Sequence, residues 1–147
     1  MLKHLFYQAW TARTLTVEDL QVYAREYGTL IETLPLGWLA LNDPETAKEE
    51  IEHVEYWDVF TNDLGTKKSD PQLTETTALV LTAQTLFSHP ATALGALYAF
   101  EVQQPAAAES KLDGLDKWYN IDEADKKYFK LHSTNWHESE KILTQIR

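Results

Sequence analysis

Apolar and polar residues follow one another along this chain with the period of a helix. Apolar residues recur three and four positions apart over most of its length, and no segment shows the strict alternation of a β-strand. Thr16 with Asp19 three residues later resembles a capping box, which predicts a helix from about Val17 that is bent or broken at Pro35. The pattern therefore predicts an all-α protein of about six or seven helices.

Two Asp-Pro pairs mark further helix starts. Asp43-Pro44 places an N-cap before a proline at the first helical position, and the helix that follows is expected to end near Gly65. Asp70-Pro71 gives the same signal for a helix through TALVLTAQTLF.

The second half of the chain holds two longer predicted helices. His89-Pro90 begins the helix that carries Glu101, and we expect Pro105 to kink this helix before Gly114. Asp122 is expected to cap a last helix that continues to the C-terminus. We find no internal repeat or long linker, so residues 1–147 are expected to form a single domain.

Composition narrows the class of protein. The formal net charge of −10 argues against a nucleic-acid partner and against docking on anionic membranes. No apolar run is long enough for a membrane span, the first residues do not resemble a signal peptide, and there is no cysteine for disulfides or thiolate chemistry. We therefore expect a cytoplasmic protein.

One predicted helix carries a Glu-x-x-His pair on its apolar face. Glu50 and His53 are three residues apart within EEIEHVEYWDVF, and the same face continues through Trp57 and Phe60. A Glu-x-x-His pair that points into a helical bundle is the unit that di-iron carboxylate proteins use. Carboxylate and imidazole ligands together suit iron or manganese.

Two more helices bring metal-competent side chains onto apolar faces. Glu101 follows the apolar run ATALGALYAF, where an unpaired charge would be costly. His132 lies in the apolar stripe of the last predicted helix, whereas His137 falls with lysines on the expected solvent face. The sequence therefore predicts one metal site made of Glu50, His53, Glu101 and His132. Alternatively, each of these residues has an ordinary structural role, such as a hydrogen-bonded core histidine or a Glu101 ion pair with Lys111.

At these residues the chain resembles a known family. The segments YAFEVQQPAAAESKLDGLDKWY, DKKYFKLH and EEIEHVEYWDVF are similar to the haem-oxygenase-like metal oxidases, and the resemblance covers most of the chain in the right order. This superfamily includes the chlamydial death-domain-associating protein, the decarboxylase that makes 1-undecene, pyrroloquinoline-quinone synthase and thiaminase II. The resemblance implies a haem-oxygenase-like helical bundle, in a version that is short mainly at its N-terminus.

The resemblance also implies a function. It assigns one or two Fe(II) ions to the four ligands named above, with dioxygen and a small-molecule substrate as reactants, and Lys111 matches a lysine that lines the pocket. The family completes its second iron site with Asp and His where this chain has Trp136 and Ser139. We expect Trp57, Tyr98 and Trp136 to shape the pocket.

Two functions follow as hypotheses. The first is a non-haem iron oxidase or oxygenase; the second is a catalytically degenerate domain that binds small ligands or partners. The second rests on the missing Asp and His, so the sequence leaves open whether the chain is an enzyme. A bundle this short is also expected to form a homodimer.

Overall fold

All regular structure in the described residues is helical. The computed structural model describes residues 2–119 and 121–146, and the all-α prediction is confirmed. The elements are α1 (Leu5–Thr11), α2 (Val17–Ile31), α3 (Leu34–Ala40), α4 (Pro44–Asp63), α5 (Thr74–Leu86), α6 (Pro90–Glu101), α7 (Gln104–Trp118), the 3₁₀ turn η1 (Glu123–Lys126), α8 (Lys127–Thr134) and α9 (His137–Ile146). None of these helices is both long and apolar enough to cross a bilayer.

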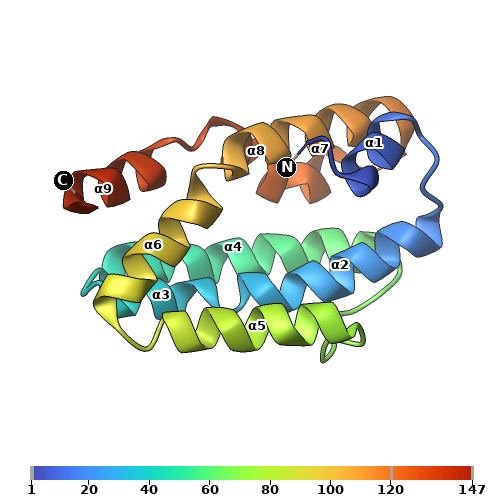
Figure 1. The fold of residues 1–147 in the computed structure, drawn as a ribbon. Helices are drawn as coiled ribbons and strands as arrows, with labels where there is room; N and C mark the ends of the chain where they lie inside the picture. The colour runs from blue at the N-terminus through green and yellow to red at the C-terminus, as the bar shows by residue number, and fades with distance from the viewer. Residues whose placement is uncertain (1, 120, 147) are drawn as a thin grey trace.

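The helices form two layers (Figure 1). One layer contains α2, α3, α4 and α5, and the other contains α1, α7, α8 and α9. Helix α6 runs from the first layer to the second, and α9 packs beside it. The layers meet where α4 packs against α8, and a site built from both helices therefore lies between them.

Local signals fixed several helix ends as predicted. The Thr16 hydroxyl accepts a hydrogen bond from the Asp19 amide while the Asp19 carboxylate accepts one from the Thr16 amide, so the capping box is confirmed. Asp43 caps α4, which has proline at its first position. After α4 the chain turns at Gly65, whose φ of 71° lies in the left-handed region that glycine adopts without strain.

The predicted start of α5 was wrong. Asp70-Pro71 does not begin the helix; α5 begins at Thr74, and its N-cap residue Leu73 offers no side-chain acceptor. Glu26 of α2 supplies the acceptor instead. Its carboxylate accepts hydrogen bonds from the backbone amides of Gln72, at 2.8 Å, and Leu73, at 3.3 Å. The helix start is therefore set by a residue 46 positions away in the sequence.

Three predicted continuities are also corrected. The break after α2 falls at Glu32 and Thr33, so Pro35 lies in the first turn of α3. Between α6 and α7 the chain breaks at residues 102–103 rather than kinking at Pro105. The last predicted helix is divided into η1, α8 and α9, with residues 135–136 between the two α-helices. The breaks at residues 102–103 and 135–136 change which side chains of the following helices face the interior.

Two apolar clusters form the core. The first surrounds Trp57, Trp10 and Tyr128, and the second surrounds Trp38 and Leu97. Helix α4 passes from the second cluster at Ala47 to the first at Trp57. Glu50 and His53 lie between these points on α4, and hydrophobic side chains therefore enclose them on both sides.

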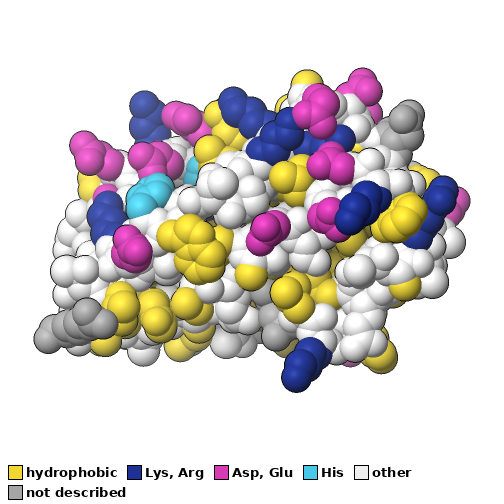
Figure 2. Space-filling view, turned by 90° about the horizontal axis from the view of Figure 1, so that it is seen from above, with side chains coloured by type: hydrophobic (Ala, Val, Ile, Leu, Met, Phe, Trp, Pro, Cys, Tyr) yellow, Lys and Arg dark blue, Asp and Glu magenta, His cyan; other side chains and the backbone are white. Residues whose placement is uncertain are grey.

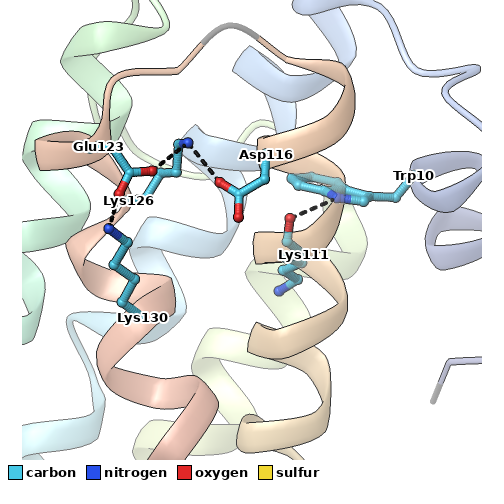
Figure 3. Close-up of polar contacts among 6 residues, drawn as sticks. All are labelled: Trp10, Lys111, Asp116, Glu123, Lys126 and Lys130. Carbon is cyan, nitrogen blue, oxygen red and sulfur yellow. Dashed lines mark hydrogen bonds and ion pairs between the residues drawn. The ribbon is translucent and has the colours of Figure 1, made fainter.

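The α7–α8 pair is held by a buried lysine. Lys126 is 6% exposed and donates to Asp116 of α7 at 2.7 Å and to Glu123 of η1 at 2.9 Å, while Glu123 also binds Lys130 of α8 (Figure 3). The hydrogen bond to Asp116 is the main cause that raises the pKa of Lys126 above its ordinary value. This network fixes the start of α8 against α7 and thereby the position of His132.

Candidate metal centre

The four residues expected as metal ligands come together in the interior. Glu50 and His53 lie on α4, Glu101 is the last residue of α6 and His132 lies on α8. None of the four is more than 6% exposed. Three helices from both layers therefore present carboxylates and imidazoles to one buried volume.

One group of three can hold an ion between α4 and α8. It consists of Glu50, His53 and His132, and each residue offers a ligand atom within 4.8 Å of the others. The two imidazole rings lie 4.6 Å apart, centroid to centroid, at an angle of 75°. Nδ1 of His53 is 3.4 Å from Oε2 of Glu50, too loose for a good hydrogen bond and compatible with an ion between the two side chains.

A second group contains a residue that sequence reasoning missed. Glu50, Glu101 and Glu138 also offer ligand atoms within 4.8 Å of one another. Glu138, on the first turn of α9, is 1% exposed. Glu50 belongs to both groups. The four expected ligands therefore do not surround a single point; they divide into two neighbouring sites with Glu50 in common.

The break before α9 explains why Glu138 was missed. In an unbroken helix, six residues after His132 is a rotation of roughly 240° from the face of that histidine. The break at Asn135 and Trp136 re-aims the chain, and Glu138 then points inward. Trp136 is 50% exposed, and the Ser139 hydroxyl donates to the Trp136 carbonyl. In the sequence, Glu138 is simply an acidic residue next to residues expected to face solvent, so nothing local indicated that it points inward.

The carboxylates of the second group lack internal partners. Both oxygens of Glu50 and one oxygen each of Glu101 and Glu138 are buried without a hydrogen-bond partner in the described part of the chain. Burial, and after it the repulsion from Glu50, raises the pKa of Glu101 well above its ordinary value and also raises the pKa of Glu138. Unpaired buried carboxylates are destabilising, and a cation between them would satisfy all three.

The two histidines have different environments. Nδ1 of His132 lies 2.9 Å from the backbone carbonyl of Tyr128. A carbonyl only accepts, so Nδ1 carries the proton and Nε2 keeps its lone pair for a metal. Burial lowers the pKa of His132 to about 3, so its ring is neutral at physiological pH. Burial also acts to lower the pKa of His53, but the neighbouring Glu50 carboxylate outweighs it and the pKa is raised.

This donor set fits iron. Carboxylates and imidazoles, here three and two, are the ligand types of non-haem iron and manganese sites. Three ionised carboxylates carry a charge that one or two divalent ions would balance, and the orphaned oxygens leave ligand positions that no protein donor fills.

One cavity is lined by ligands of the centre, and a second is linked to the centre through hydrogen bonds. The first has a volume of about 400 Å³, is open to solvent, and has His53 and Glu138 in its wall. The second, of about 410 Å³, is mostly apolar and lies between α2, α5 and α6. A hydrogen-bond chain leads inward from it: Tyr27 donates to Gln104, and Gln104 donates to Tyr128, each at 3.2 Å. The Tyr128 ring lies 4.1 Å from the His132 ring.

The residues expected to shape the pocket lie in different places. Trp57 is fully buried, donates to the Ala24 carbonyl at 2.9 Å and packs against Tyr128. Lys111 is 3% exposed and its Nζ lies 4.6 to 5.6 Å from three tyrosine rings, those of Tyr7, Tyr23 and Tyr27. Burial lowers the pKa of Lys111 to about 7. Tyr98 is partly buried, and Trp136 is not brought to the centre.

Comparison with known proteins gives one family. Residues 23–135 match the family model described as iron-containing redox enzyme. The chain is 29% identical over 153 residues to the 4-aminobenzoate synthase of Chlamydia pneumoniae, covering 90% of this chain and 68% of that protein. It is 33% identical over 165 residues to the 4-aminobenzoate synthase of Nitrosomonas europaea, covering 91% and 67%. The chain thus spans about two thirds of the length of these relatives.

Proposed function

Because the chain belongs to the iron-containing redox enzyme family, we propose that it is a non-haem iron oxidase or oxygenase that uses dioxygen on a small organic molecule. The observation that carries the proposal is the pair of ligand groups that share Glu50 and leave buried carboxylate oxygens unpaired. The alternative, a degenerate binding domain, depended on the missing Asp and His at positions 136 and 139. Glu138 offers a carboxylate in their place, which favours the enzyme.

We propose two iron ions per chain. Glu50, His53 and His132 would hold one, and Glu50, Glu101 and Glu138 would hold the other, with the Glu50 carboxylate common to both. When bound, Fe(II) supplies the electrons that activate dioxygen. The chain positions these ligands from four helices, keeps His132 in the tautomer that ligates through Nε2, and encloses the site with Trp57 and Tyr128.

The printed function of the relatives suggests a product. We propose that the chain contributes to the formation of 4-aminobenzoate, a flat aromatic compound with an amine and a carboxylate. The apolar cavity has a size that accepts a single ring, and its inner end meets the Tyr27–Gln104–Tyr128 hydrogen-bond chain. Lys111 would provide a reactive amine. With a pKa of about 7, this amine is about half neutral near pH 7, and the neutral form has a lone pair available for reaction.

Metal content tests the proposal directly. The protein would be loaded with Fe(II) without oxygen, desalted and analysed for iron per chain. We expect about two ions, with about one in Glu101→Gln and in Glu138→Gln. Glu109→Gln, on the exposed side of α7, is the matched control and should keep both ions. Retention of two ions in the Glu101 and Glu138 variants would exclude this ligand set.

Product analysis tests the chemistry. Admission of dioxygen to the iron-loaded protein, together with a protein-free extract of small molecules that supplies the carbon skeleton, should consume the gas and yield 4-aminobenzoate, detected by mass spectrometry. Lys111→Met is expected to retain its iron and lose product formation. If the iron-loaded wild-type protein consumes dioxygen and makes another product, the oxidase assignment stands and 4-aminobenzoate is wrong.

We also propose that the chain forms a homodimer. Four large apolar residues on α3 and α5 are each about half exposed: Leu36, Leu39, Leu79 and Leu81. Exposed apolar surface of this kind is often covered by a second copy. Light scattering coupled to size exclusion should give twice the mass of the chain; the mass of one chain at micromolar concentration would contradict the dimer.

A further inference from the structure

We propose a third cation site at the surface, formed by Glu49, His137 and Glu138, through which divalent iron reaches the internal centre. The loading role depends on the proposed function, because it requires that the internal centre holds iron. The site itself does not, because two of its three ligands, Glu49 and His137, lie outside the internal groups.

The three residues come from two helices that meet at the rim of the solvent-open cavity. Glu49 lies on α4 and is exposed, and His137 and Glu138 begin α9. Each offers a ligand atom within 4.8 Å of the other two. One imidazole and two carboxylates form a usual set of protein ligands for a divalent transition metal.

Exposed acidic residues alone would not indicate a site, but Glu138 is not exposed. It is 1% exposed, and its Oε1 has no hydrogen-bond partner among the described residues. His53 lines the same cavity, and its Nδ1 is also buried without a partner among the described residues. The cavity thus has a surface end at Glu49 and His137 and an inner end at ligands of the internal centre.

Within residues 2–119 and 121–146, Glu138 alone is common to the outer group and the internal groups. An ion held by Glu49 and His137 would already contact one internal ligand, and it could move inward by exchanging these two for Glu50 and Glu101. Glu52 also lines the cavity and adds negative charge. Figure 2 shows histidine among several acidic side chains on the face of the molecule that carries α9. A funnel of negative charge concentrates cations at such an opening.

Occupancy of the outer site can be measured with Co(II) on the iron-loaded full chain. We expect one further Co(II) per chain in wild type, bound more weakly than the internal ions, and its loss in the double variant Glu49→Gln/His137→Gln. Glu52→Gln lines the same cavity and removes the same charge without removing a ligand, so it should keep the extra ion. Absence of the extra Co(II) in wild type, or its retention in the double variant, would overturn the site.

The loading role is measured by the rate of anaerobic Fe(II) uptake from a chromogenic chelator. The double variant should load at least fivefold more slowly and reach the same final iron content, whereas Glu52→Gln should load within twofold of wild type. Equal rates in wild type and the double variant would overturn the role. If wild type takes up no internal iron, the proposed function and the loading role both fail, and the metal-free protein still tests the outer site by its Co(II) binding.

Discussion

Lys111 is buried where a charged amine is unfavourable, and this has a measurable consequence for stability. Its pKa is about 7 in the folded protein against an ordinary 10.5. The unfolded chain therefore binds the extra proton between these values, and wild-type stability rises as the pH rises from about 7 toward 10.5. We predict that Lys111→Met is more stable than wild type at pH 7, by up to about 4 kcal/mol at roughly 1.4 kcal/mol per pKa unit.

Urea denaturation at pH 7 and pH 9 checks this prediction. The advantage of Lys111→Met should shrink by more than half at pH 9, because the free energy needed to neutralise the wild-type lysine falls as the pH approaches its ordinary pKa of 10.5. Lys117→Met is the control, since Lys117 forms an exposed ion pair with Asp113 on the same helix. An advantage that does not change with pH would show that packing, and not charge burial, is responsible.

The residues of the centre were predictable only where they depend on local spacing. Glu50 and His53 are neighbours on one continuous helix, and Glu101 and His132 each stand out as polar residues on an apolar face. Glu138 follows no such rule. Its inward orientation depends on where α8 ends, and neither Asn135 nor Trp136 marks a helix end as clearly as proline or glycine does.

At the scale of the element, the start of α5 depends on Glu26 of another helix. Its carboxylate accepts the two amide hydrogen bonds at the start of α5, and these outweigh burial and lower the pKa of Glu26. We predict that Glu26→Ala reduces the free energy of unfolding by about 1–3 kcal/mol at pH 7, the usual cost of leaving buried donors unpaired. Glu75→Ala, exposed in the first turn of α5, should cost much less.

The contribution of Glu26 to the free energy of unfolding should change with pH in a definite direction. A lowered folded-state pKa means that the contribution of Glu26 is present above its ordinary pKa of 4.5 and is lost as the pH falls through the folded value. The difference between wild type and Glu26→Ala should therefore narrow in denaturation experiments near pH 3. A difference as large at pH 3 as at pH 7 would contradict the role of the charged carboxylate.

The break between α8 and α9 makes a second prediction at this scale. In a continuous helix, position 139 would share the face of His132, because seven residues make nearly two full turns. In the structure, position 138 holds the inward carboxylate. We predict that the exchange variant Glu138→Ser/Ser139→Glu, which keeps composition and net charge, binds about one iron ion instead of two. Two ions in this variant would mean that α9 continues the register of α8.

These elements show what local sequence determines. The capping box at Thr16, the N-cap at Asp43 and the turn at Gly65 are short-range features, and they were predicted correctly. The start of α5 and the breaks before α7 and α9 were not. The start of α5 depends on a distant side chain, and the continuous apolar patterns across the two breaks concealed the interruptions.

At the scale of the whole molecule, the centre joins helices from both layers. It draws on α4 from one layer, α8 and α9 from the other, and α6 between them. Ligand binding to the folded state alone stabilises a protein by roughly 2.7 kcal/mol at a hundredfold excess over Kd. Iron loading should therefore raise the thermal midpoint by several degrees in wild type and by less in Glu101→Gln.

Without metal, the order of stability of wild type and Glu101→Gln should be reversed. The raised pKa of Glu101 means that its favourable contribution is present below its ordinary pKa of 4.5 and is lost as the pH rises through the higher folded value. Glu101→Gln removes this loss. The metal-free variant should therefore be more stable than metal-free wild type, with an advantage that grows from pH 5 to pH 8.

Thermal melts of both proteins, with and without Fe(II), across this pH range test the reversal. The variant should be the more stable protein without metal and the less stable one with it. A structural Glu101 with an internal partner would instead make the variant less stable in both states. The reversal would mean that the three neighbouring carboxylates destabilise the metal-free protein. A cation-binding role then explains why the chain has this arrangement.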